Sequence, residues 1–266
     1  MALSINGLLR ELAYEYYISY DSQEDNSIKT SLTNISGKLR NEFGTKLISV
    51  SDFGSYKRDT ILPRAYDSGS DVDIMVKFNH ATLAKTPDTY RTWLLAFADK
   101  HFSRSSVYRD FPTVVVELGH IKFDLVPAYE VSYWSTSTLY IPDSRNEWQS
   151  TDPSALTADL TRVNTHYGSI VKPIIRLLKA WNTRAGKPYS SYELEKAIIN
   201  INFSGDNYQT GFFYAINQLS DYGKPQWAKE KIATLKKYKG YVEAYLYNND
   251  MPKALLWLYY ILPPRK

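Results

Sequence analysis

The stretch Asp67–Phe78, DSGSDVDIMVKF, constrains the fold most, because it places Asp71 and Asp73 one residue apart at the mouth of an apolar run. Side chains alternate between the two faces of a β-strand. A strand here directs both carboxylates to one face and the apolar side chains between them into a core. Two neighbouring carboxylates repel unless a cation binds them or one stays protonated. The pair therefore indicates a divalent metal site or, alternatively, a strand end that emerges into solvent.

A third acid favours the metal site. Asp124, in IKFDLVP, lies among apolar residues in a second expected strand, and an acid inside an apolar strand is costly unless something pairs with it. If the two strands are neighbours, three carboxylates meet at one sheet edge. Oxygen ligands of this kind select Mg²⁺ or Mn²⁺, and such a cluster suits phosphoryl transfer.

A glycine and a serine precede the paired acids. Gly54 and Ser55 directly follow an expected strand, in DFGSYKRDT. Glycine permits close backbone approach, and amides at the start of a helix bind phosphate oxygens. Gly-Ser also occurs as an ordinary turn, so the interpretation as a phosphate-binding turn depends on the acids that follow it.

Helix and strand patterns alternate up to about residue 150 and give way to a nearly all-helical region. Strands are expected over 46–53, 71–78, 113–119 and 121–129. Helices are expected over 28–43, from 89, and over 153–166, 169–184, 191–200, 210–220 and 226–239, with one more at the C-terminus. The pattern predicts an α+β fold with an α/β lobe over residues 1–150 and a helical lobe over residues 151–266.

Composition excludes several classes of protein. The 266 residues are 44% hydrophobic, include no cysteine and carry a net charge of +4, which excludes disulfides and cysteine zinc sites. The charge suits a polyanionic small ligand as well as nucleic acid. The N-terminus does not resemble a signal peptide, and the apolar run Ala254–Leu262 is about half the length that spans a bilayer. We therefore expect a cytoplasmic protein with no membrane partner.

The motifs together resemble a known superfamily. GSYKRDT, SDVDIMV and IKFDLVP follow the order of the polymerase-β-like nucleotidyltransferases: Gly-Ser, Asp-x-Asp, then a distal Asp. Downstream, YIPDSRNEWQSTDP, HYGSIVKPIIRLLKAWN and SSYELE resemble the bacterial cGAS/DncV-like nucleotidyltransferases (CD-NTases), which make cyclic oligonucleotide second messengers in anti-phage defence. The resemblance covers roughly residues 50–200. It implies a nucleotidyltransferase lobe with a mixed sheet, a C-terminal helical lobe and a cleft between them.

The resemblance also assigns roles to individual residues. It implies that Asp71, Asp73 and Asp124 bind Mg²⁺ or Mn²⁺ and are catalytic. Nucleotide-binding roles are implied for Gly54, Ser55, Thr151, Lys179, Ser191 and Tyr192.

Structural alternatives remain for some of these nucleotide-binding assignments. Thr151 or Asp152 can cap the helix that starts at Pro153, and Tyr192 can be an ordinary packing residue. Ser190, next to Ser191, fits a capping box with Glu193 and is explained by it. The resemblance aligns Thr151 with a position that influences base choice in the family, and a threonine there suggests purine nucleotides.

The implied activity is synthesis of a cyclic oligonucleotide from nucleoside triphosphates, with ATP and GTP as expected substrates. We expect a cyclic dinucleotide such as c-di-GMP or a cGAMP-like molecule, which a downstream effector senses. Double-stranded DNA is not expected as a partner. The DNA sensor of the superfamily that this chain resembles carries a zinc-binding insertion, and this chain has no cysteine and no obvious insertion. The alternatives are a linear oligonucleotide synthetase, nucleotide transfer to a small molecule or protein, and a nucleotide-binding regulator without turnover.

Overall fold

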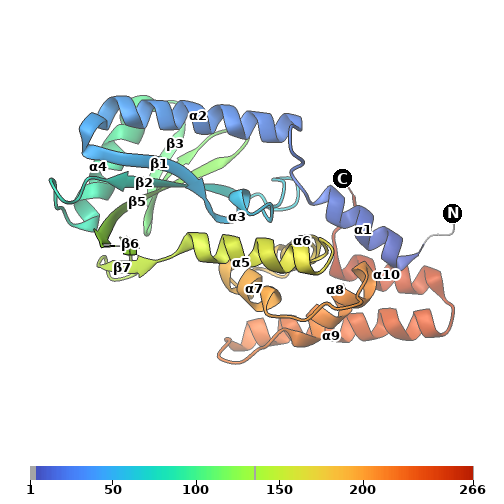
Figure 1. Ribbon diagram of the computed structural model, residues 1–266. Coiled ribbons are helices and arrows are strands. Elements are labelled where there is room, and N and C mark those ends of the chain that lie inside the picture. The colour runs from blue at the N-terminus through green and yellow to red at the C-terminus, as the bar shows by residue number, and fades with distance from the viewer. Residues whose placement is uncertain (1–3, 135, 266) are drawn as a thin grey trace. The chain divides into compact units, whose positions relative to one another are not determined.

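The computed structural model describes residues 4–134 and 136–265 and shows an α+β fold (Figure 1). Contacts divide the chain into two compact units that interleave in sequence. A sheet unit comprises residues 19–58 and 69–157, and a helical unit comprises residues 1–18, 59–68 and 158–266. The division into functional lobes at residue 150 stays a prediction.

The sheet unit contains seven strands and three helices that lie wholly within it, counted over the described residues. The strands are β1 (Leu47–Phe53), β2 (Asp71–Phe78), β3 (Ser106–Asp110), β4 (Thr113–Glu117), β5 (Lys122–Tyr133), β6 (Thr136–Pro142) and β7 (Trp148–Thr151). The helices are α2 (Gln23–Phe43), α3 (Gly54–Lys57) and α4 (Pro87–His101), and a short 3-10 turn, Gly44–Lys46, follows α2. The helix α5 (Pro153–His166) begins in this unit and ends in the helical one.

The sheet is mixed, as predicted. Its main order is β1-β2-β5-β4-β3, with β6 and β7 continuing from the far part of β5. The β2 and β5 strands run parallel, and all the other pairs are antiparallel. The expected strands of residues 113–119 and 121–129 are present as β4 and β5, which pair antiparallel. The strands β3, β6 and β7 were missed, because their short, largely exposed sequences carry little apolar alternation.

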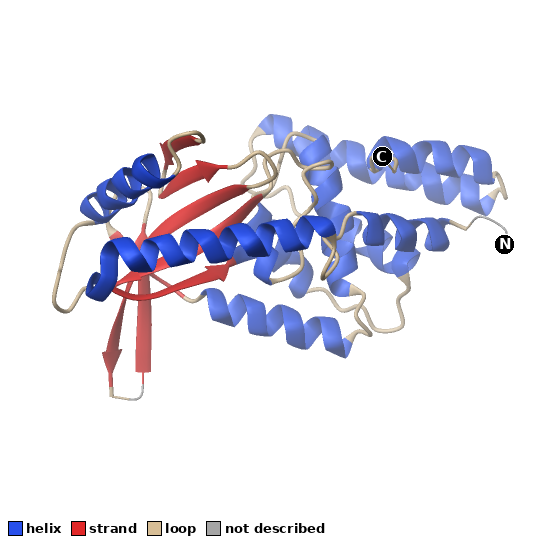
Figure 2. Ribbon diagram, turned by 90° about the horizontal axis from the view of Figure 1, so that it is seen from above, coloured by secondary structure: helices blue, strands red, loops and turns tan. Residues whose placement is uncertain are grey.

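Two helices cover one face of this sheet. The helix α2 packs on β1, and α4 packs on β3, β4 and β5 (Figures 1 and 2). The predicted apolar face of β2 is fully buried, and Phe78 at its end stacks on Tyr90 of α4 with ring centroids 4.3 Å apart. The odd-numbered residues of β2, including both aspartates, therefore face away from these helices.

The helical unit is built around one buried helix, α6 (Val171–Arg184), which contacts α1 (Ile5–Glu15), α7 (Ser191–Ile199) and α8 (Tyr208–Gln218). The helices α9 (Gln226–Tyr247) and α10 (Met251–Ile261) pack against each other. The predicted C-terminal helix is present as α10, but only one side of it is buried: Leu258 is covered while Leu256 is 53% exposed. Among the described residues, no helix combines the length and apolarity needed to cross a membrane.

Candidate active site

The three aspartates meet because β2 and β5 are neighbouring parallel strands. Their register sets Asp73 directly beside Asp124 and Asp71 beside Lys122. Partners in a parallel pair share one face of the sheet, so the carboxylates lie together on the face away from α2 and α4. The strand order on which the sequence made this convergence conditional is present in the fold, and it sets the three aspartates on one face of the sheet.

Electrostatics show that this cluster lacks positive charge. Burial and the negative charges of Asp71 and Asp124 raise the pKa of Asp73 to about 8, although Arg58 and Lys122 oppose the shift. Burial and the charge of Asp71 likewise raise the pKa of Asp124 to about 6, against the effect of Lys122. The cluster therefore holds protons that carboxylates in water release well below neutral pH.

Lys122 supplies part of the missing charge. Its Nζ lies 3.4 Å from Asp71 Oδ2 and 3.4 Å from Asp124 Oδ1. Burial acts to lower the pKa of Lys122, but the charges of Asp124 and Asp71 outweigh it and raise that pKa. Lys122 was missed in the sequence, although its position two residues before Asp124 on one strand face is a readable signal.

The donor set fits a hard divalent cation. Asp124 Oδ1 is buried and, apart from its 3.4 Å ion pair with Lys122 Nζ, has no hydrogen-bond partner among the described groups. Carboxylate oxygens are the ligands that Mg²⁺ and Mn²⁺ prefer. In the described parts of the chain, residues 4–134 and 136–265, no group of three acidic or histidine side chains is arranged to coordinate a metal ion. A cation bound by Asp71 and Asp124 would therefore displace the Lys122 ammonium.

Gly54 brings the backbone against this cluster. It follows β1 at the start of α3 and has φ +77°, a left-handed conformation that favours glycine. A Cβ atom at this position would lie 1.9 Å from Asp73 Oδ2. The glycine is thus required both by its backbone angle and by the close approach of Asp73. Ser55, predicted to bind phosphate, is the next residue of α3.

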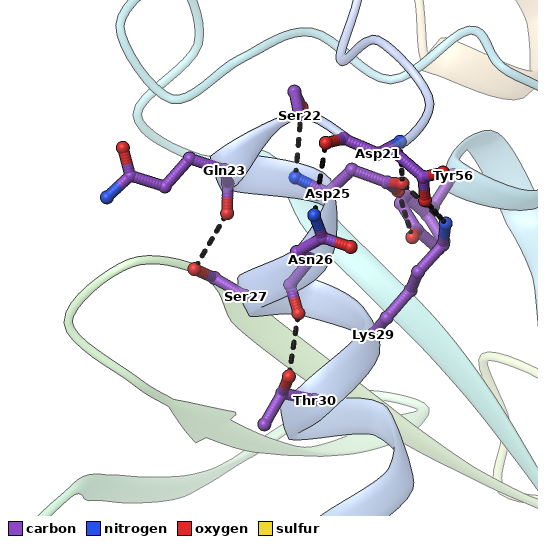
Figure 3. A network of polar contacts seen from close by, with 9 residues as sticks. All are labelled: Asp21, Ser22, Gln23, Asp25, Asn26, Ser27, Lys29, Thr30 and Tyr56. Atoms are coloured by element: carbon purple, nitrogen blue, oxygen red, sulfur yellow. Dashed lines mark hydrogen bonds and ion pairs between the residues drawn. The ribbon is translucent and has the colours of Figure 1, made fainter.

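Tyr56 holds α3 to the start of α2 (Figure 3). Its hydroxyl donates a hydrogen bond of 2.6 Å to Asp25 Oδ1. Asp25 is 5% exposed, accepts from the Asp21 amide and pairs with Lys29 at 2.7 Å. Burial would raise the pKa of Asp25, but the hydrogen bonds from Lys29 and Tyr56 outweigh it and lower that pKa. The ionised carboxylate anchors the element that carries Gly54.

A cavity of about 660 Å³ opens within the sheet unit. Its lining comes from β1, β2, β5, β6, β7 and the start of α5, and it includes Thr151. The cap of α5 is Asp152, whose Oδ1 accepts from the Ala155 amide at 2.9 Å. Asp152 is therefore the residue that caps α5, and Thr151 has no capping role but lines the cavity. No sequence pattern indicated two further lining residues, Lys77 and Glu130.

The other predicted nucleotide contacts belong to the helical unit. Lys179, on α6, is 6% exposed and forms an ion pair with the fully buried Glu195 of α7. Ser191 and Tyr192 open α7, and Tyr192 is 55% exposed. The predicted cap is present beside them, since Ser190 Oγ accepts from the Glu193 amide at 3.2 Å. Lys179 thus has a structural partner in this state.

Two histidines, His120 and His166, lie at exposed positions. His120 is in the turn between β4 and β5, where its Nε2 lies 3.1 Å from Ser31 Oγ. His166 is the last residue of α5. Neither is among the groups that shift the pKa of the aspartates.

Comparison with known proteins gives a family match over most of the chain. A family model described as "Second Messenger Oligonucleotide or Dinucleotide Synthetase domain" (SMODS) matches residues 4–164. A curated relative, a probable cyclic nucleotide synthase of Bacillus cereus (strain VD146), is 29% identical over 127 residues, which are 46% of this chain. The match spans 38% of that relative's own length.

Solved structures share the fold. The CdnC protein of Escherichia coli MS115-1, solved with ATP, gives a TM-score of 0.73 at 12% identity and covers 98% of both chains. The CdnE cyclic dinucleotide synthase of Elizabethkingia meningoseptica, with GTP and Apcpp, gives 0.66 at 20% identity over 81% of this chain and 83% of the other. The Vibrio cholerae DncV cyclic AMP-GMP synthase, with a linear intermediate, gives 0.64 at 12% identity over 100% and 82%. The predicted fold class and family resemblance are confirmed.

Proposed function

The chain belongs to the family of Second Messenger Oligonucleotide or Dinucleotide Synthetase domains, and we propose that it is a metal-dependent nucleotidyltransferase that joins nucleoside triphosphates into a cyclic dinucleotide. The observation that carries this proposal is the register of β2 and β5, which sets Asp73 beside Asp124 with Asp71 on the same face. Metal-assisted phosphoryl transfer uses such a cluster of oxygen ligands to hold its cations.

The residues divide the chemistry between them. The acceptor hydroxyl oxygen attacks the α-phosphorus of a donor nucleotide, the bond to pyrophosphate breaks, and the hydroxyl proton is released. Asp71, Asp73 and Asp124 would hold Mg²⁺ or Mn²⁺, which neutralises the phosphates and lowers the pKa of the hydroxyl. Gly54 lies against Asp73, and the backbone of the Gly54–Ser55 turn would bind the triphosphate. A second round within the linear intermediate closes the ring.

The substrates are proposed to be ATP and GTP. Relatives with this fold were solved with ATP, with GTP and Apcpp, and with a linear pppA(3',5')pG intermediate. Thr151, for which the family resemblance suggests a purine, lines the cavity of the sheet unit. We place the product in anti-phage signalling, where an effector senses it. The expectations of cytoplasmic location and of no activation by double-stranded DNA stay predictions.

The test uses labelled nucleoside triphosphates with Mg²⁺, followed by phosphatase treatment and mass spectrometry of the product. A cyclic product has no terminal phosphate and survives the phosphatase. Asp73→Asn is expected to abolish pyrophosphate release. A phosphatase-sensitive product would indicate a linear oligonucleotide synthetase instead. Absence of turnover in the wild type with every nucleotide combination would indicate a binding regulator.

A further inference from the structure

The cavity of the sheet unit lies on the same sheet face as the aspartate cluster. Met75 and Lys77 line it, and they follow Asp73 on β2 at two-residue intervals, so they share its side of the strand. Each such interval is about 7 Å. Its volume of about 660 Å³ lies within the range of small-ligand pockets. A molecule whose phosphates lie at the aspartates can therefore extend its other end into this cavity.

The charge of the cavity lining indicates which part of a nucleotide the cavity can bind. Three acidic residues, Asp52, Glu130 and Asp152, line the cavity against one lysine, Lys77. Asp52 is paired with Lys57 at 3.4 Å. Glu130 is likewise paired with Lys77 at 2.6 Å, which leaves the carboxylate of Asp152 as the net charge of the lining, and this negative charge disfavours a triphosphate. The cavity is suited to an uncharged part of a nucleotide, its base and ribose.

Lys77 and Glu130 form a fixed polar pair in the cavity. Lys77 Nζ lies 2.6 Å from Glu130 Oε2, and Ser137 donates a hydrogen bond to Glu130 Oε1. Their side chains are 19% and 30% exposed, so both retain accessible surface. The hydrogen bonds from Lys77 and Ser137 lower the pKa of Glu130, which stays an acceptor at neutral pH.

The pair still has unused hydrogen-bonding capacity. An ammonium has three N–H donors, and a carboxylate has about four lone-pair sites. One donor of Lys77 and two sites of Glu130 are accounted for by the contacts within the pair and from Ser137. The cavity therefore presents the remaining N–H donors of the Lys77 ammonium next to the remaining acceptor sites of the Glu130 carboxylate.

We propose that this cavity binds the guanine base of a GTP substrate, with Lys77 donating to O6 and Glu130 accepting from N1–H and the exocyclic N2–H. The inference deepens the proposed function and depends on it for the identity of the ligand as a nucleotide. Along its Watson–Crick edge, guanine presents one acceptor, O6, followed by two donors, N1–H and N2–H. This order complements the Lys77 donor and the Glu130 acceptor. Adenine presents N6 as a donor and N1 as an acceptor, so both of its positions oppose the pair. Uracil offers O4 and N3–H but no exocyclic amine.

The first experiment measures base choice in turnover. Wild-type protein with equimolar ATP, GTP, CTP and UTP, each labelled in turn, is expected to incorporate guanine in at least one position. Glu130→Gln keeps the size of the side chain but replaces an acceptor by a donor. It is expected to lower kcat/KM for GTP about 10- to 100-fold, the discrimination of a good bidentate contact, while ATP use changes less. Lys77→Met is expected to act in the same direction.

The matched control is Glu42→Gln, since Glu42 also pairs with a lysine, Lys100 at 2.8 Å, but does not line the cavity. This variant is expected to keep wild-type base choice. Unchanged GTP use by folded Glu130→Gln and Lys77→Met, or a wild-type product without guanine, overturns the inference.

A second experiment needs no turnover, so it separates this inference from the proposed function. Calorimetry with guanosine and adenosine, which carry no phosphates, is expected to show tighter binding of guanosine to the wild type. Glu130→Gln is expected to remove this preference. Selective guanosine binding without any pyrophosphate release would support the base site and contradict the proposed activity. Equal binding of both nucleosides would overturn the base site whatever the activity.

Discussion

Gly54 and Asp73 are in contact at the heart of the candidate site, and each limits what the other can be. The glycine has a left-handed φ of +77°, and the carboxylate occupies the space where any larger residue would put its Cβ. Asp73 in turn has its pKa raised by burial and by two neighbouring acids. Two residue-scale predictions follow from this pair.

The first prediction concerns Gly54→Ala. The new Cβ must displace the Asp73 carboxylate, and a displacement of about 1 Å at a reacting centre can cost on the order of 100-fold in rate. We expect pyrophosphate release to fall by about this factor, with a loss of about 1–2 kcal/mol in unfolding free energy from the left-handed backbone. Kinetics and urea unfolding measure the two effects.

Gly44→Ala is the control for this variant. Gly44 also has a positive φ, +49°, but a Cβ there meets nothing within 4 Å. We expect a similar loss of stability with nearly full activity. Equal activity in the two variants would show that the contact between Gly54 and Asp73 is irrelevant to catalysis.

The second prediction concerns pH. Because the pKa of Asp73 is raised to about 8, the folded state binds a proton more tightly than the unfolded chain does. This contribution to stability is present at low pH and is lost as pH rises through about 8. Without divalent cations, we expect the unfolding free energy of the wild type to fall, relative to Asp73→Asn, between pH 6 and pH 8. The upper limit is about 3 kcal/mol, at roughly 1.4 kcal/mol per pH unit for one proton.

Thermal or urea unfolding in EDTA measures this difference, and repeating it with Mg²⁺ tests the ion. A bound cation favours the ionised carboxylates, so the pH dependence should weaken when Mg²⁺ is added. A stability difference between the two proteins that is flat from pH 6 to pH 8 in EDTA would contradict the raised pKa of Asp73.

At the scale of elements, the position of the Gly54 turn depends on α2 as well as on β1. The short helix α3 has only four residues, too few to be stable by itself. The hydrogen bond from Tyr56 to the buried Asp25 joins α3 to the start of α2 (Figure 3). A helix distant from the aspartates in sequence thus holds the turn that contacts them.

Tyr56→Phe tests this connection. Removing the hydroxyl takes one donor from a buried, ionised carboxylate, and we expect a loss of about 1–3 kcal/mol at pH 7. The lowered pKa of Asp25 contributes stability that is present above its unfolded pKa and is lost as pH falls through its folded value. The difference between wild type and variant should therefore shrink below about pH 4. Urea unfolding at pH 7 and pH 3.5 measures it.

The control lies on the same helix. The Ser27 hydroxyl donates only to the Gln23 carbonyl within α2, at 2.8 Å, so Ser27→Ala should change stability little at either pH. A Tyr56→Phe variant as stable as Ser27→Ala at pH 7 would rule out the proposed anchoring of α3.

At the scale of the whole molecule, the chain passes between its two units more than once. Residues 59–68 belong to the helical unit, although they lie in sequence between α3 and β2 of the sheet unit. In that unit Thr60 donates a 2.6 Å hydrogen bond to Glu195, the partner of Lys179. Residues about 120 to 135 positions apart in sequence thus share one buried polar cluster.

Variants of Lys179 can test two roles of this residue: its pairing with Glu195 in the buried cluster and its predicted contact with the triphosphate. Lys179→Met leaves the Glu195 carboxylate buried without its ammonium, and we expect a loss of about 3–5 kcal/mol. Lys179→Met combined with Glu195→Leu removes both charges and should recover most of that loss. Denaturant unfolding of the three proteins measures the coupling.

The double variant also isolates the predicted nucleotide contact. If Lys179 contacts the triphosphate during the reaction, the stable double variant should show a raised KM for nucleoside triphosphates. A wild-type KM would restrict Lys179 to its pairing with Glu195.

The sequence by itself determined the elements with regular apolar periodicity and the identity of the acids. Alternating apolar residues specified β2 to the residue, and the helix of residues 28–43 ends at Gly44 as predicted, because these patterns depend on local periodicity and backbone conformation. The family resemblance came from the same local motifs. Short exposed strands such as β3 and β7 lacked this periodicity and were not predicted.

Only the tertiary structure decided which residues meet. The parallel register of β2 and β5 set Asp73 beside Asp124, brought Lys122 between the acids and left Lys77 against Glu130. It also paired Lys179 with Glu195, which no local pattern indicated. Strand order and side-chain pairing depend on contacts between distant segments, and their energies appear only when the chain is folded.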